Sequence, residues 1–471
     1  MAENKMDMAK VLAMLSQTQE APPPLENVER RVLEIPYINR FSQVEKRTAR
    51  AYIPENAPRP MPLIFVPHYD IPEDSMELRG YLKQGWVVAS PSPFLGEYNV
   101  RLTDDDLVFN NAAMYELSHL PEIDRNRIAV VGGSAGGYMT LMLNGTRLGL
   151  CAAIANGPIA NIYFTFETYW QRASKLNQAK LAELMATPKE QGEEQPDEDP
   201  RLKVMRAVSK LPIPFIAALS GGFLPIVDAI PEKDTPAYWE ARTGTGVADR
   251  FCNPLMINHS TSDVLLPVDQ ISHRKVYVQP GDTLPKDFDM RMPENLPGKM
   301  KLTLEEALPT DQTRTEVFFV PTPAPESVLP WDEEKRFNIN IFNDGAPEGY
   351  GSHSARMDVG RRDDVPYLKA QFAKGAAETC SLTPAMLREL LLRHEGKSLT
   401  LPAHEGVDDS AYGSLAMYRK DTEEMLQIWA ANHGAEALEK VWCQVLENEK
   451  SDSLRETLKK AWTSCGSLKE E

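Results

Sequence analysis

Residues 128–143 read IAVVGGSAGGYMTLML and lie near the middle of the first half of a 471-residue chain. The wholly apolar run from Ile128 to Val131 predicts a buried strand, and the segment from about Gly137 to Leu148 predicts a helix. Between them, Gly132-Gly133-Ser134-Ala135-Gly136 fits the pattern G-x-S-x-G. In a strand–turn–helix setting this pattern predicts a sharp turn that holds the serine hydroxyl clear of the sheet.

Strands and helices alternate on both sides of this turn. Apolar or alternating runs predict strands at residues 28–38, 44–53, 63–66, 86–89, 128–131, 152–155, 254–257 and 337–342. Helical spacing occurs between several of these runs, at residues 76–84, 104–120 and 137–148. This alternation predicts an α/β fold, with a mostly parallel central sheet and helices on both faces.

The spacing of the strands also predicts insertions. About a hundred residues separate the strands at 152–155 and 254–257, far more than one crossover connection needs. The predicted units are an N-terminal helical arm (1–27), a core (28–160 and 250–378), an inserted cap or lid (161–249), a second insertion within the core (276–332) and a helical C-terminal extension (379–471).

Composition and charge exclude several classes of protein. The chain has 51 Lys and Arg against 68 Asp and Glu, a net charge of −17, which argues against nucleic-acid and anionic-membrane partners. Five scattered cysteines without C-x-x-C spacing predict reduced thiols, with no disulfide framework and no metal site. The first residues lack the features of a signal peptide, so we expect a cytoplasmic protein.

Ser134 is the candidate nucleophile. The alternative is a glycine-rich helix start that allows close packing or binds phosphate, but no lysine follows as it does in a P-loop. Gly132 to Thr140 resembles the nucleophile elbow of the α/β-hydrolase superfamily, and specifically that of the prolyl-oligopeptidase branch and its esterase relatives. The resemblance covers residues 30–160 and 250–375. It implies an α/β-hydrolase fold, catalysis without a cofactor, and a triad in the order serine, aspartate, histidine.

That order directs the search for the acid and the base. Asp263 follows the strand at 254–257 and, with Pro267 and Gln270, resembles the D-x-x-V-P-x-x-Q pattern of the prolyl-oligopeptidase branch. Asp269 is expected in the first turn of the following helix instead. Among eight histidines, His353 alone follows a last strand, at 337–342, so it is the predicted base.

An oxyanion hole needs two donors. The first predicted donor is the backbone N–H of Ala135, which follows the nucleophile. The strand at 63–66 ends in Pro67-His68-Tyr69-Asp70, which resembles the Pro-Tyr-Asp segment of cocaine esterase and the X-prolyl dipeptidyl-peptidase relatives, where a tyrosine hydroxyl donates. Tyr69 is therefore the second predicted donor, and a tyrosine that only packs at the sheet end is the alternative.

The predicted function is a serine hydrolase, with a carboxylesterase as first choice. We expect a small-molecule ester substrate, and Phe215 and Phe223 of the apolar stretch 211–230 are expected to line the pocket. We expect the chain to depart from these families, because only about thirty residues precede the first predicted strand, too few for a β-propeller, and the predicted tail is helical where the X-prolyl and cocaine-esterase group has a β-rich domain. A hydrolase of short peptides is the alternative, and a non-catalytic ligand-binding hydrolase fold is a distant one. The oligomeric state is left open, a homo-oligomer included.

Overall fold

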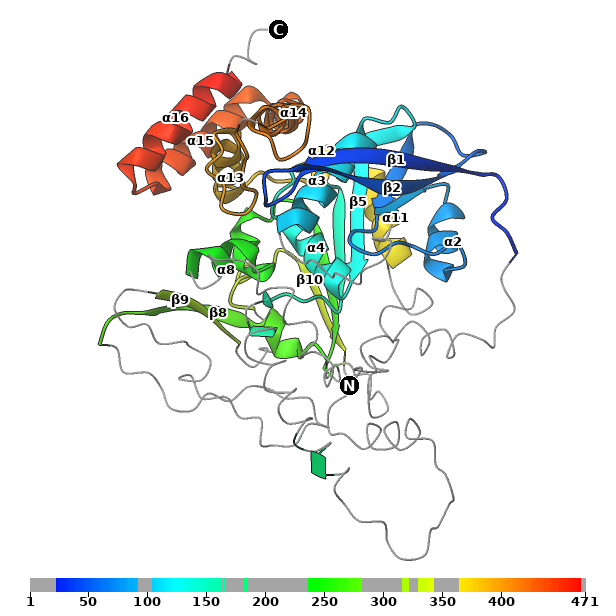
Figure 1. Ribbon diagram of the computed structural model, residues 1–471, viewed down its shortest axis with the longest axis horizontal. Helices are drawn as coiled ribbons and strands as arrows, with labels where there is room; N and C mark the ends of the chain where they lie inside the picture. Colours follow the sequence, from blue (N-terminus) through cyan, green and yellow to red (C-terminus); the bar gives the residue numbers. More distant parts are fainter. Residues whose placement is uncertain are drawn as a thin grey trace, which may run out of the picture.

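The computed structural model describes residues 23–91, 104–162, 164–165, 179, 182–183, 236–261, 263, 265–281, 316–321, 329–342, 364–405 and 407–466. Figure 1 shows a central sheet flanked by helices, with a group of C-terminal helices at one end of it. Of the predicted N-terminal arm, residues 1–22 lie outside the described ranges, and residues 23–27 form no helix.

The central sheet has eight strands in the order β1-β2-β4-β3-β5-β6-β7-β10. Their bounds are β1 (Val28–Ile38), β2 (Val44–Pro54), β3 (Met61–Phe65), β4 (Val87–Pro91), β5 (Ile123–Gly133), β6 (Ala152–Asn156), β7 (Leu255–Ser260) and β10 (Asn338–Phe342). β2 runs antiparallel to β1 and β4, and all other neighbours are parallel. The mostly parallel sheet predicted from the sequence is confirmed, and the carboxyl ends of β5, β6, β7 and β10 meet at one edge.

Helices cover both faces of this sheet. They are α2 (Met76–Leu82), α3 (Asp104–Ser118), α4 (Ala135–Asn144) and α11 (Asp364–Lys374). Phe65 and Val130 belong to the core that includes α3 and α4, whereas their neighbours Ile64 and Val131 belong to the core that includes α2 and α11. The side chains of successive strand residues are therefore buried on opposite faces of the sheet, which explains why these strands are apolar throughout.

The C-terminal extension is helical, as predicted. After α12 (Ala376–Thr379) it contains α13 (Pro384–His394), α14 (Leu415–His433), α15 (Ala435–Asn448) and α16 (Asp452–Gly466). A buried ion pair fixes it to the core, because Arg147 donates to Asp421 of α14 at 3.0 Å and Arg393 of α13 lies 3.3 Å from the same carboxylate. Burial would raise the pKa of Asp421, but the two guanidinium groups hold it below its ordinary value.

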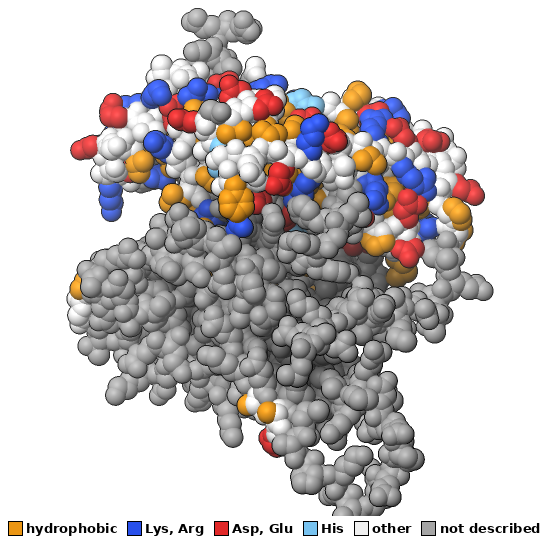
Figure 2. Space-filling view, in the orientation of Figure 1, with side chains coloured by type: hydrophobic (Ala, Val, Ile, Leu, Met, Phe, Trp, Pro, Cys, Tyr) orange, Lys and Arg blue, Asp and Glu red, His pale blue; other side chains and the backbone are white. Residues whose placement is uncertain are grey.

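The predicted insertions are described in part. The end of the first contains α8 (Pro236–Arg242) and the 3₁₀ helix η4 (Thr245–Arg250), and most of its residues lie outside the described ranges. A separate antiparallel pair, β8 (His273–Val278) with β9 (Glu316–Pro321), spans the second. The described part of the face in Figure 2 carries acidic and basic side chains intermixed. Within the described ranges, no helix is both long enough and apolar enough to cross a membrane.

Candidate active site

Ser134 lies on the turn between β5 and α4. Its backbone has φ 55° and ψ −120°, a conformation that strains a residue carrying a Cβ. Its N–H donates to the carbonyl of Asn156 at 3.0 Å, and its carbonyl accepts from Tyr138 at 3.0 Å and from Ile159 at 3.3 Å. The sharp turn predicted from the sequence is present, and contacts from both α4 and the loop after β6 maintain its strain.

Glycines surround this turn because other backbone segments approach it closely. A Cβ added to Gly132 would lie 2.3 Å from the carbonyl oxygen of Gly136. A Cβ on Gly136 would lie 2.9 Å from the carbonyl oxygen of Pro67, and one on Gly137 the same distance from Pro158. Contacts under 3.0 Å require the neighbour to move, so larger residues would distort the turn.

Ala135 is the first residue of α4, which begins two residues before the predicted start at Gly137. The difference arises because Ala135 and Gly136 are helical residues, whereas the G-x-S-x-G pattern placed them in the turn. The N–H groups of a helix's first turn have no carbonyl partner within the helix. The Ala135 N–H therefore has no carbonyl partner within α4 and directly follows Ser134, and its role as an oxyanion donor stays a prediction.

Tyr69 follows β3, and its ring lies beside the nucleophile turn. Its Cδ2 atom is 3.4 Å from the Cβ position of Gly136, and the residue is 45% exposed. Its N–H donates to the carbonyl of Pro67 at 2.9 Å, which folds the loop back over itself. The structure thus brings Tyr69 to the elbow, while hydrogen bonding from its hydroxyl to an oxyanion stays a prediction.

A buried network holds the loop that carries Tyr69, and the sequence analysis missed it. His68 has φ 72°, and its Nδ1 lies 2.7 Å from Oδ2 of Asp106 in α3. Arg47 of β2 donates to the other oxygen of this carboxylate at 2.9 Å. Burial would raise the pKa of Asp106, but His68 and Arg47 hold it below its ordinary value. The His68 ring also packs edge-on against Tyr69, with centroids 4.4 Å apart.

Asp263 lies just beyond the carboxyl end of β7 and is buried. Its Oδ1 accepts from the N–H of Leu265 at 3.0 Å and from that of Leu266 at 2.9 Å. These bonds fix the carboxylate from its own loop. This geometry suits a carboxylate that orients a histidine, since such a group must itself be held still.

The structure also places Asp269 and Gln270, which follow Asp263 along the chain. Asp269 lies in the first turn of the short 3₁₀ helix η5 (Val268–Ile271), as predicted. The Gln270 amide accepts from Ala160 N–H at 3.0 Å and donates to the carbonyl of Pro158 at 2.7 Å. Gln270 therefore anchors the loop after β6, the same loop that contacts the Ser134 carbonyl.

The remaining predicted site residues lie outside the described ranges: His353, Phe215 and Phe223. The last strand before His353 is confirmed as β10, and its end adjoins the end of β7, because the Thr261 N–H donates to the Phe342 carbonyl at 2.8 Å. Within the described ranges, no group of three or more His, Cys, Asp or Glu side chains is arranged to hold a metal ion.

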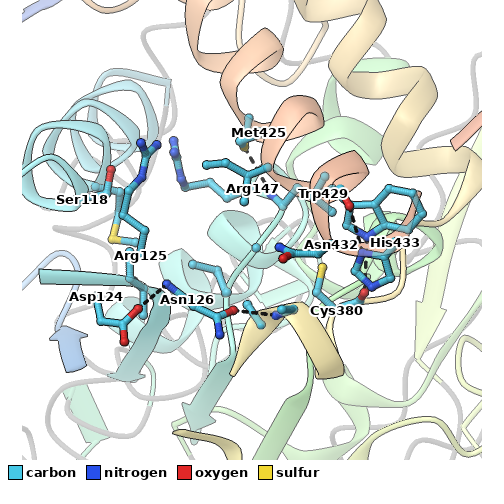
Figure 3. Close-up of a pocket in the computed structure, with 18 residues that line it drawn as sticks. Ser118, Asp124, Arg125, Asn126, Arg147, Cys380, Met425, Trp429, Asn432 and His433 are labelled. Carbon is cyan, nitrogen blue, oxygen red and sulfur yellow. Dashed lines mark hydrogen bonds between the residues drawn. The ribbon is translucent and has the colours of Figure 1, made fainter. Parts of the chain in front are cut away.

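Figure 3 shows side chains that line a cavity of about 450 Å³. Its lining includes Asp124 and Asn126 at the start of β5, Cys380 after α12, and Trp429 with His433 of α14. It therefore lies between the C-terminal extension and the region where β5 begins, whereas Ser134 follows the opposite end of β5. This position excludes the cavity as the acyl pocket of Ser134.

Comparison with known proteins bears on the region around the elbow. Residues 105–188 match the prolyl oligopeptidase family, Peptidase_S9. This segment includes nearly all of α3, the whole of β5, the Ser134 turn, α4 and β6. The match and the strained serine turn support a serine hydrolase. No match was found among curated proteins.

The chain is also similar to solved structures of hydrolases. A puromycin hydrolase is 16% identical over 52% of this chain and 32% of its own, with a TM-score of 0.32. An acylaminoacyl peptidase from Pyrococcus horikoshii is 15% identical over 78% of this chain and 44% of its own, with a TM-score of 0.40. An esterase from Pyrococcus furiosus is 14% identical over 54% of this chain and 82% of its own, with a TM-score of 0.31. The chain thus spans less than half the length of the first two proteins. The strand order of its sheet is that of an α/β-hydrolase fold, and residues 105–188 are similar to the prolyl oligopeptidase family.

Proposed function

We propose that the chain cleaves a carboxylic ester through an acyl-enzyme intermediate formed on Ser134. In this mechanism His353 removes the proton from the Ser134 hydroxyl as the oxygen attacks the ester carbonyl, and Asp263 orients the imidazole. The Ala135 N–H and the Tyr69 hydroxyl stabilise the oxyanion. The alkoxide leaves with the proton from His353, and water then attacks the acyl-enzyme by the same acid–base route.

The conformation of Ser134 is the observation that carries this proposal. A serine at φ 55° is uncommon, and strained residues concentrate where function requires an exact side-chain direction. Close backbone contacts at Gly132 and Gly136 exclude larger residues around it and keep the turn sharp, and we infer a nucleophile there rather than a phosphate-binding helix start. The absence of a lysine after the glycines agrees with this choice.

The order of the strands supports the other two triad members. β5, β6, β7 and β10 are adjacent and parallel, so the residues after β5, β7 and β10 follow the same edge of the sheet. Ser134 follows β5, Asp263 follows β7 and His353 follows β10 along the chain. A nucleophile, an acid and a base in this order match the requirement of the hydrolase triad.

An ester is the proposed substrate because ester cleavage demands less help for the leaving group than amide cleavage does. An alkoxide is a better leaving group than an amine, which must be protonated as it departs, so a serine triad cleaves esters more readily than amides. Phe215 and Phe223 are proposed to bind the apolar acyl or alcohol group. The second candidate is a hydrolase of short peptides, which the match of residues 105–188 to the prolyl oligopeptidase family favours.

A substrate panel tests this proposal. Purified protein and the Ser134→Ala variant are assayed with p-nitrophenyl acetate and butyrate, and with aminoacyl and prolyl p-nitroanilides. The ester proposal predicts kcat/KM at least 100-fold higher for an ester than for any anilide, and loss of turnover in Ser134→Ala. A preference for an anilide, after allowance for the slower intrinsic cleavage of anilides, would favour the peptidase. Turnover that survives Ser134→Ala would contradict both the esterase and the peptidase proposals.

A further inference from the structure

Three buried or half-buried asparagines form a hydrogen-bonded ladder across the sheet. The Asn340 amide of β10 donates to Oδ1 of Asn258 in β7 at 2.9 Å, and the Asn258 amide donates to Oδ1 of Asn156 in β6 at 2.7 Å. Each hydrogen-bonded pair of asparagines is also paired in register on adjacent parallel strands. The Asn156 amide in turn donates to Oδ2 of Asp364, the first residue of α11, at 3.5 Å.

The carboxylate at its end gives the ladder a direction. Asp364 is buried, and its Oδ2 also accepts from the Tyr81 hydroxyl at 3.4 Å. The Asn156 NH₂ group donates to this carboxyl oxygen, so the Asn156 oxygen is the atom that accepts from Asn258. The same reasoning orients Asn258 toward Asn340. Aligned amide dipoles in a chain of hydrogen bonds strengthen one another, which makes the ladder more rigid than separate pairs.

The ladder lies beneath the strand ends that carry the candidate triad. Asn156 pairs in register with Gly133, and its carbonyl accepts the Ser134 N–H at 3.0 Å. The carbonyl of Asn258 accepts the Gly157 N–H at 2.7 Å, and Asn258 precedes Asp263 by five residues. One chain of side-chain hydrogen bonds therefore fixes the spacing of β6, β7 and β10, next to the end of β5 that Ser134 follows and near the end of β7 that Asp263 follows.

The ladder also connects β10 and α11, the elements that precede and follow the sequence containing His353. Asn340 lies in β10, the strand that precedes this sequence, and Asp364 opens α11, which follows it. Asn340 and Asp364 are thus connected through two intervening strands, although 24 positions separate them along the chain.

We propose that Asn258, with Asn156 and Asn340, is a positioning residue that sets the distance between the nucleophile turn and the acid-bearing loop. This inference rests on the proposed function of Ser134. Asn258 is central because its side chain hydrogen-bonds two other ladder asparagines, Asn156 on one side and Asn340 on the other. A purely structural ladder would contribute to folding stability alone, whereas a positioning ladder also controls kcat.

Asn253 provides a matched control. It lies two residues before β7, the strand that holds Asn258, is also buried, and donates to Asn144 at 2.7 Å and to the Arg147 carbonyl at 2.8 Å. It also accepts from the Gly149 N–H at 3.1 Å. Asn253 therefore has more hydrogen bonds to lose than Asn258, but it lies at the opposite end of β7 from Asp263.

The experiment compares Asn258→Leu with Asn253→Leu. Both variants should melt at lower temperature than the wild type, and the Asn253 variant should lose at least as much stability. Asn258→Leu should lower kcat per folded molecule by about 10- to 100-fold with KM within about twofold, because misplaced reacting groups lose rate rather than binding. Asn253→Leu should keep kcat within about threefold of the wild type. Should Asn258→Leu fail to fold, Asn340→Ala at the half-buried end of the ladder should show the same separation of kcat from KM, with a smaller loss.

Hydrogen exchange separates failure of this inference from failure of the proposed function. The Ser134 N–H, which bonds the Asn156 carbonyl, should exchange at least tenfold faster in Asn258→Leu than in Asn253→Leu. Unchanged kcat together with unchanged Ser134 exchange would overturn the positioning role. If wild-type protein cleaves neither esters nor anilides, the proposed function fails, and the exchange of Ser134 alone still decides whether the ladder holds the turn.

Discussion

Replacing Gly136 with alanine tests whether the loop from Pro67 to Tyr69 belongs to the active site. The new Cβ would lie 2.9 Å from the Pro67 carbonyl oxygen and 3.4 Å from Cδ2 of Tyr69. Ordinary van der Waals contact begins at 3.4 Å, so the Pro67 carbonyl must retreat by about 0.5 Å. Tyr69 moves with it, because its N–H is bonded to that carbonyl at 2.9 Å.

The expected effect is larger on catalysis than on stability. Alanine gains about 1 kcal/mol over glycine within a helix, and crowding a packed contact costs about 1–3 kcal/mol, so the free energy of unfolding should fall by at most about 2 kcal/mol. Catalytic groups need placement within about 0.5 Å, and an error of 1 Å costs about 100-fold in rate. A shift of half that size predicts a loss of about tenfold in kcat.

Gly145→Ala is the matched control for this prediction. Gly145 caps the other end of α4, and its added Cβ would also meet a neighbour at 2.9 Å, the Cγ2 of Val247. Steady-state hydrolysis of p-nitrophenyl butyrate gives kcat, and thermal unfolding gives stability. Gly145→Ala should change only the melting temperature. A folded Gly136→Ala variant with wild-type kcat would refute the placement of the Pro67–Tyr69 loop in the site.

Three other substitutions have defined outcomes. Tyr69→Phe should lower kcat by about 10²- to 10³-fold with little change in KM if the hydroxyl is an oxyanion donor, and kcat within a few-fold of wild type would leave the ring a packing role. Asp263→Asn should lower kcat by about 10⁴-fold because the base takes the wrong tautomer, and an active variant would exclude Asp263 as the acid. Asp421→Asn should cost about 3–5 kcal/mol at neutral pH, because it weakens the pairing of two buried arginines. The folded-state pKa of Asp421 is lowered from its ordinary 3.8, so its contribution is present above that pH and lost as pH falls below it. Melting temperatures across pH 2–7 should therefore differ most between wild type and Asp421→Asn at neutral pH, and a difference that does not shrink in acid would contradict this assignment.

The fold and the nucleophile turn were predictable because their determinants are local. Apolar strands of four or five residues, separated by helical spacing, identified the parallel sheet, and the glycines around Ser134 identified the turn. The position of Asp263 followed from its place after a strand. The start of α4 was predicted two residues late, because glycine propensity suggested a turn where close backbone contacts require glycine within a helix.

The asparagine ladder and the His68 network were not predictable, because each depends on register between distant segments. Asn156 and Asn258 are 102 residues apart, and Asn258 and Asn340 are 82 apart, so only the strand order reveals that they face one another. His68 and Asp106 are 38 residues apart, and their contact depends on how α3 packs on the sheet. A single asparagine or histidine at a strand end carries no periodic signal.

Labelling with a fluorophosphonate tests the central claim, that Ser134 is an activated nucleophile. Only a serine hydroxyl beside a general base attacks phosphorus quickly, so intact-mass analysis should show one adduct, and peptide mapping should place it on Ser134. Ser134→Ala should abolish the adduct and lower kcat by about 10⁴- to 10⁶-fold while the protein stays folded. Labelling at another residue, or full labelling of folded Ser134→Ala, would contradict the account.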